Sequence, residues 1–75
     1  MIYYILFPGD TQEDCFKDAN QLGHISFGKF HRNEGFKVLN NAIANFEHIL
    51  DQIRIISSDG KNHTIGEFLD IVGKH

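Results

Sequence analysis

The chain has 75 residues, of which 41% are hydrophobic, with seven phenylalanines, one cysteine and a formal net charge of −3 at pH 7. Because a chain this short buries only about 60% of the surface that it exposes when unfolded, it is predicted to form a single globular domain, residues 1–75, with a narrow margin of stability. The lone cysteine excludes an intramolecular disulfide, and the acidic balance argues against a protein that holds duplex DNA mainly by its phosphates.

The chain starts with an apolar run, "MIYYILF", which ends at Pro8-Gly9. No positive residue precedes this run, and it is too short for a secretory signal or a membrane span. A reducing cytoplasm is expected because the chain has a single cysteine. Residues 2–7 favour a strand, and both of their alternating rows are apolar. Such a pattern is typical of a strand at the centre of a sheet whose two faces are covered.

A helix is predicted over residues 11–22, because Asp10 and Thr11 are competing N-caps and Gly23 stands where a helix stop is expected. Its apolar face would hold Cys15, Ala19 and Leu22. A second strand is predicted over "HISFGKF", residues 24–30. In a regular strand, Phe27 and Phe30 would lie on opposite faces. A bulge at Gly28 would be needed to bring them to one face.

The second half of the chain predicts two more helices and a third strand. The helix over residues 34–47 has Asn33 as a possible cap and one apolar stripe. This stripe contains Phe36, Leu39, Ala42, Ile43 and Phe46. A strand over 53–57 is expected to turn at Asp59-Gly60 and return through residues 61–63. The last helix, 64–73, begins with the capping box of Thr64 and Glu67 and stops at Gly73.

The order of these elements, β-α-β-α-β-α, predicts an α/β or α+β fold with a three-stranded sheet packed against helices. In the preferred arrangement, right-handed crossovers place the first two helices on opposite faces of a central first strand. In the competing one, the sheet is antiparallel or mixed and all helices lie on one face. The row Tyr3, Ile5 and Phe7 would then be exposed as a surface for a homodimer or another partner.

The side chains with catalytic potential do not form a known pattern, so the chain is predicted to be noncatalytic and to need no cofactor. Its histidines lack the spacings of a metal site, and no metal is expected. They are His24, His31, His48, His63 and His75. Cys15 is interpreted as a small buried hydrophobe rather than a nucleophile. The acids at Asp10, Glu13 and Asp14 are favoured by the dipole of a first helical turn.

The segment "SFGKFHR", residues 26–32, lies in the only locally positive part of the chain. We predict a patch there that binds an acidic protein partner, formed by Lys29, His31, Arg32 and Lys37. Phe27 and Phe30 are expected to pack in the core. In the alternative interpretation, Phe27, Lys29, Phe30 and Arg32 bind single-stranded nucleic acid, because two rings beside two cations can stack bases and contact phosphates.

The opening "MIYYILFPGDTQEDC" and the closing "DGKNHTIGEFLDIVGK" resemble small accessory proteins of T-even-like bacteriophages. The resemblance is one of general style over the whole chain, without a diagnostic motif, and no functional residue is carried over from it. It implies a protein made in the cytoplasm of an infected bacterium, in a group whose members often bind and redirect a host protein. The function expected from the sequence is therefore that of an interaction module.

Overall fold

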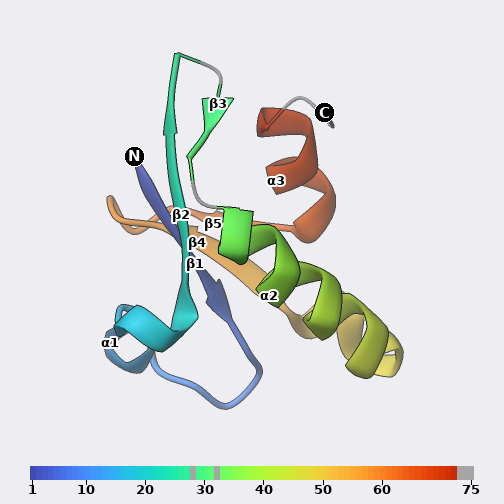
Figure 1. Cartoon of the computed structure of the whole chain (residues 1–75). Coiled ribbons are helices and arrows are strands. Elements are labelled where there is room, and N and C mark those ends of the chain that lie inside the picture. Colours follow the sequence, from blue (N-terminus) through green and yellow to red (C-terminus); the bar gives the residue numbers. More distant parts are fainter. Residues whose placement is uncertain (28, 32, 73–75) are drawn as a thin grey trace.

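The first strand of the chain lies at the centre of one antiparallel sheet (Figure 1). The computed structural model describes residues 1–27, 29–31 and 33–72. Within them the sheet has five strands in the order β3-β2-β1-β4-β5, and every neighbouring pair is antiparallel. The strands are β1 (Ile2–Leu6), β2 (Gln21–Ser26), β3 (Lys29–Phe30), β4 (Arg54–Ser57) and β5 (Asn62–His63). The fold is α+β; the prediction of three strands is wrong, because two of the predicted strand regions form hairpins.

Helices lie on both faces of this sheet, as Figure 1 shows. The described helices are α1 (Gln12–Cys15), α2 (Asn33–Asn45) and α3 (Ile65–Ile71), with the 3₁₀ helices η1 (Asp18–Asn20) and η2 (Glu47–Gln52). Helices α2 and α3 cover one face and α1 lies against the other. Tyr4, on the face away from α2 and α3, contacts Phe16 at the end of α1 with 4.9 Å between ring centroids. The expected position of β1 at the centre, with helices on opposite faces, is confirmed. The expected right-handed crossovers are wrong, because every neighbouring pair of strands is antiparallel.

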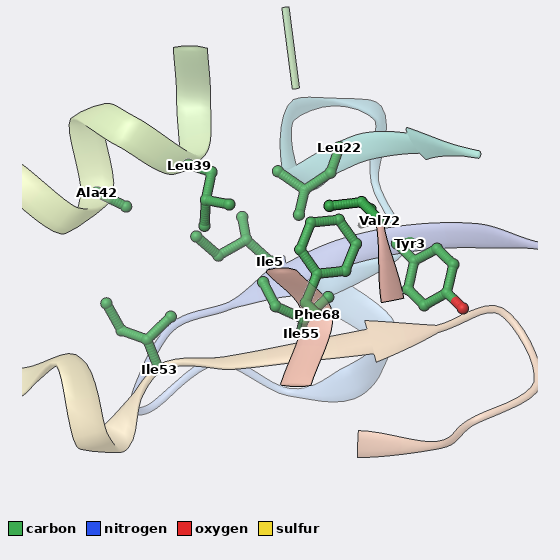
Figure 2. Packing of buried hydrophobic residues seen from close by; sticks show 9 residues of the cluster. All are labelled: Tyr3, Ile5, Leu22, Leu39, Ala42, Ile53, Ile55, Phe68 and Val72. Carbon is green, nitrogen blue, oxygen red and sulfur yellow. The ribbon is translucent and has the colours of Figure 1, made fainter. Parts of the chain in front are cut away.

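The hydrophobic core fills the layer between the sheet and helices α2 and α3 (Figure 2). It contains Tyr3, Ile5, Leu22, Leu39, Ala42, Ile53, Ile55, Phe68 and Val72. The ring of Phe68 stands at the centre of this cluster and has no exposed surface. Phe7 is partly buried against the same cluster. The exposure of the row Tyr3, Ile5 and Phe7, which only the competing arrangement implied, is therefore not found, and the less covered row is Ile2, Tyr4 and Leu6, all half-buried.

Strand β2 contains an irregularity that the periodicity of its residues does not show. The register between β1 and β2 shifts between Tyr3, which pairs with Gly23, and Tyr4, which pairs with Gln21. Leu22 is thus an extra residue, and both Leu22 and Gly23 are buried. Gly23 has a φ of 141°, a conformation that other residues rarely adopt. The predicted helix 11–22 is consequently wrong beyond its first turn: α1 ends at Cys15, Ala19 is exposed, and residues 21–22 belong to the sheet.

Helix α2 approaches this irregular part of β2 very closely at Gly35, which is buried. A Cβ atom at that position would lie 1.7 Å from the carbonyl oxygen of Leu22. The backbones of the helix and the strand are therefore in direct contact, and a side chain at residue 35 has no room. The side chain of Phe36, predicted on the apolar stripe of this helix, and that of Asn33, its predicted cap, lie outside the described part of the structure.

In the last part of the chain, the structure agrees with what neighbouring residues predict. The hydroxyl of Thr64 accepts a hydrogen bond from the backbone N–H of Glu67 at 3.0 Å, and the Glu67 carboxylate accepts one from the N–H of Thr64 at 2.8 Å. The predicted capping box is thus confirmed. The turn at Asp59-Gly60 and the return strand β5 are also confirmed. Gly73, the predicted stop, lies outside the described residues.

Candidate interaction site

The β2–β3 hairpin, Gly23–His31, carries the candidate site. Ser26 pairs with Lys29, so the loop between the two strands has two residues, Phe27 and Gly28. Two-residue loops of antiparallel hairpins need positive φ at one or both positions. Phe27 takes this conformation with a φ of 52°. The predicted continuous strand 24–30 is therefore interrupted at its middle; Gly28, the site of the predicted bulge, lies outside the described residues.

The side chain of Phe27 is 102% exposed, so none of the described residues packs against it. A bulky residue with positive φ costs of order 1–3 kcal/mol, and such strain is often found where a side chain has a function. The prediction that Phe27 packs in the core is wrong. The physical reason is the short loop, which places residue 27 beyond the last strand pair, where no helix covers it.

Phe30, by contrast, is half-buried and packs against the core. Its ring meets that of Phe68 edge-on, with 5.7 Å between centroids. The predicted core role is confirmed for this residue. Ile25, which pairs with Phe30 across the hairpin, packs against the same cluster. The inner face of the hairpin is thus anchored on the core while its tip projects.

The opposite face of the hairpin is held by two histidines. His24 and His31 stack with ring centroids 4.7 Å apart and planes at 16°. Their backbones are joined by a hydrogen bond from the N–H of His31 to the carbonyl of His24, at 3.0 Å. His31 Nε2 and the Ser26 hydroxyl lie 2.6 Å apart as hydrogen-bond partners. These contacts stiffen the base of the hairpin, which presents Phe27 in a defined position.

The structure brings together two of the four residues predicted to bind a partner. Lys29 lies on β3 and His31 follows directly after it; both are exposed, and by strand alternation both lie on the face of the hairpin opposite Phe30. Lys37 is exposed on α2, the helix that covers the other face of the sheet. Arg32 lies outside the described residues. Sequence reasoning missed His24 and the exposure of Phe27, because the two-residue loop between Ser26 and Lys29 is defined by strand pairing and not by residue spacing.

Cys15 is fully buried on the α1 side of the sheet, and its thiol donates a hydrogen bond to the carbonyl of Ile5 at 3.2 Å. Burial raises the pKa of this thiol to about 11, with a smaller opposing effect of a hydrogen bond from Asn20. The nucleophilic form of cysteine is the thiolate, which is scarce at neutral pH when the pKa is this high. The interpretation of Cys15 as a core residue is confirmed.

We expect the stability of the protein to fall in alkaline solution, beginning near pH 9. The folded state raises the pKa of Cys15 from 9.0 to about 11, so it binds this proton more tightly than the unfolded chain does. The stabilisation is complete below pH 9 and is lost as the pH rises through about 11. Burial also raises the pKa of Tyr3, in the same direction. Urea unfolding of the wild type and of Cys15→Ala at several pH values checks this prediction. An equal loss of stability in the two proteins at alkaline pH would contradict it.

The described residues contain no group of three histidine, cysteine or acidic side chains that could hold a metal ion. The longest helix among them, α2, has 13 residues, and none is long and apolar enough to cross a membrane. Comparison of the chain with protein-family models, with curated proteins and with solved structures found no match.

Proposed function

We propose that the protein is a noncatalytic interaction module that binds another protein through the tip of the β2–β3 hairpin. One observation carries this proposal: Phe27 is completely exposed at a backbone conformation that costs free energy. Large aromatic side chains that enter a pocket of a partner often supply much of the binding energy at protein interfaces. An exposed ring on a short, well-held hairpin suits that role.

The rigidity of the hairpin supports the proposal. Phe30 is packed against Phe68 below the tip, and His24 and His31 stack across the strands. Binding therefore orders few groups beyond the Phe27 ring, which lowers the entropic cost of association. Charge adds a further preference, because Lys29 is exposed and no acidic residue occurs from residue 21 to residue 33. A protein partner with an apolar pocket and an acidic rim fits this surface best.

The resemblance to small accessory proteins of T-even-like bacteriophages suggests the setting of this interaction. We infer a role in the cytoplasm of an infected bacterium, where the protein binds a host protein and modulates it. The residues proposed to contribute through charge are Lys29, His31, Arg32 and Lys37. Phe27 joins them as the apolar anchor.

Replacement of Phe27 by serine is expected to leave the melting temperature nearly unchanged and to weaken partner binding by at least about 2 kcal/mol, the usual loss at an aromatic hot spot. The partner is first captured from a nuclease-treated bacterial lysate and identified, and the purified pair is then measured by calorimetry. Ile71→Ser serves as the matched control, because Ile71 is 40% exposed but lies on α3. Equal affinities of the wild type and Phe27→Ser would contradict the proposal.

Single-stranded nucleic-acid binding is a second candidate, favoured by one observation: the exposed ring of Phe27 lies near Lys29 on a hairpin without acidic residues. Only one ring is free to stack, however, because Phe30 faces Phe68. Fluorescence anisotropy with labelled oligonucleotides tests this candidate. Salt-sensitive binding that falls by about 1–3 kcal/mol in Phe27→Ala would place it above protein binding.

A further inference from the structure

The β2–β3 hairpin brings His24 and His31 together, although their separation in the sequence is not the spacing of a known metal motif. Ile25 pairs with Phe30, and at the next position along the hairpin the N–H of His31 donates a 3.0 Å hydrogen bond to the carbonyl of His24. Residues directly opposite each other on antiparallel strands point to the same face, with Cβ atoms about 4.5–5.5 Å apart. The two imidazole rings therefore lie side by side on one face of the hairpin.

The two rings are close enough for one metal ion to bind both. Their centroids are 4.7 Å apart. Imidazole nitrogens bind transition metals at about 2.0–2.1 Å, so two nitrogens on one ion lie at most about 4 Å from each other. Both side chains are exposed, so a small rotation of either ring can bring a nitrogen of each to that separation without disturbing the core.

Neutral imidazole is a ligand of Zn²⁺, Ni²⁺ and Cu²⁺, whereas Mg²⁺ and Ca²⁺ prefer oxygen ligands. We propose that His24 and His31 together bind one divalent late transition-metal ion, with water completing its coordination. The described residues bring no third histidine, cysteine or acidic side chain to this pair. Two protein ligands leave several positions open, so the ion exchanges with solvent more readily than a structural zinc ion does. The affinity should follow the general order for such ligands, with Cu²⁺ above Ni²⁺ and Zn²⁺.

Ser26 acts as a positioning residue for this site. Its hydroxyl lies 2.6 Å from His31 Nε2 as a hydrogen-bond partner. When Nε2–H donates this bond, the lone pair of Nδ1 is free for the metal and the ring keeps one orientation. Metal-binding histidines almost always have such a partner on their second nitrogen.

The exposed ammonium of Lys29, on the same face as His31, opposes the approach of a cation. Its long and flexible stem lets this charge turn into solvent, so Lys29→Ala should bind the metal at least as tightly as the wild type. The site does not involve the ring of Phe27 and thus goes beyond the proposed function. Phe27→Ser, which removes the proposed anchor, should keep the wild-type affinity for the metal, so the two proposals can fail independently.

Isothermal titration calorimetry of the 75-residue chain without an affinity tag tests the site with chloride salts of Cu²⁺, Ni²⁺, Zn²⁺ and Mg²⁺. The wild type should bind one equivalent of each transition metal, Cu²⁺ most tightly, and no Mg²⁺. Ser26→Ala should raise the dissociation constant by about tenfold, and Ser26→Thr, which keeps the hydroxyl, should restore the affinity. His24→Ala and His31→Ala should each cause a larger loss, because only one imidazole remains.

His48→Ala and His63→Ala are the matched controls, because these histidines lie on η2 and β5, away from the hairpin. They should leave the dissociation constant unchanged, and circular dichroism should show equal folding of all variants. In NMR spectra of the wild type, substoichiometric Ni²⁺ should broaden the imidazole signals of His24 and His31 and not those of the control histidines.

A wild type that binds none of the three transition metals at millimolar concentration would overturn the inference. Unchanged affinity in either hairpin histidine variant, or broadening confined to other histidines, would overturn the assignment of the site. Unchanged or tighter binding by Ser26→Ala would overturn the positioning role of Ser26.

Discussion

Gly35→Ala is expected to destabilise the protein by at least about 3 kcal/mol, a large share of the stability of a domain this small. The added methyl group would lie 1.7 Å from the Leu22 carbonyl oxygen and 2.6 Å from its carbon. Both atoms belong to the backbone of a central part of the sheet, so neither can move aside as a flexible side chain would. Helix α2 must shift away from β2, which opens the core around Leu39 and Leu22. Urea unfolding followed by circular dichroism measures the loss.

The control for this prediction is Gly66→Ala in α3. The nearest atom to a Cβ at residue 66 is the Thr64 hydroxyl oxygen, 3.9 Å away, so alanine fits without a clash. Alanine favours helix over glycine by about 1 kcal/mol, and this variant should therefore be slightly more stable than the wild type. If Gly35→Ala unfolds at the same urea concentration as the wild type, the close contact of α2 with β2 is not present in solution.

Phe68→Ala is expected to cost about 3–5 kcal/mol, the range found when a large buried aromatic is truncated. Its ring is completely buried and contacts two other aromatic rings: Tyr3 at 5.3 Å and Phe30 at 5.7 Å between centroids. Removal leaves a cavity between the sheet and α3, which Ile65, Leu69 and Val72 then hold on the core without the largest side chain of the contact. Denaturant unfolding again gives the size of the effect.

The matched control is the same substitution at Phe27, whose fully exposed ring is not packed against any described residue. Phe27→Ala should change the free energy of unfolding by less than about 0.5 kcal/mol, and so should Lys61→Ala at its exposed turn. Similar losses in Phe68→Ala and Phe27→Ala would show that α3 is not packed on the sheet as described.

The elements that could be predicted from the sequence are those specified by neighbouring residues. Thr64 and Glu67 satisfy each other within one helical turn, so the start of α3 follows from four residues. The Asp59-Gly60 turn and the apolar strand β1 are local in the same sense. Burial of Cys15 also followed correctly, since a free cysteine in an apolar setting is a common core residue.

The errors concern features that depend on distant parts of the chain. Residues 21–22 fit a helical face, but pairing with β1 draws them into the sheet, and Gly23 serves the register shift of β2 instead of a helix stop. Nothing in the spacing of residues indicates that Gly35 touches the backbone of Leu22. Antiparallel pairing on both sides of β1 likewise depends on which strands meet in space. Helical and strand periodicity do not contain that information.

The candidate site was only half predictable for a related reason. The positive character of residues 24–37 is a property of composition, and it directed attention to Lys29 and His31. Whether the two phenylalanines of this segment share a face depends on a loop of two residues between Ser26 and Lys29. That loop places Phe30 on the core and Phe27 in solvent. Phenylalanine rarely adopts a positive φ, so the conformational preference of this residue does not predict such a turn.

The position of β1 determines when the sheet can be completed during synthesis. This strand is made before both of its partners: β2 can pair with it once residue 24 is available, but its other edge stays open until residues 54–57 exist. Until that point the growing chain exposes unpaired N–H and C=O groups along an apolar strand, which is a template for pairing with other nascent chains. Synthesis of the last quarter of the chain therefore protects the rest from aggregation. Messages truncated before residue 54 should yield insoluble product.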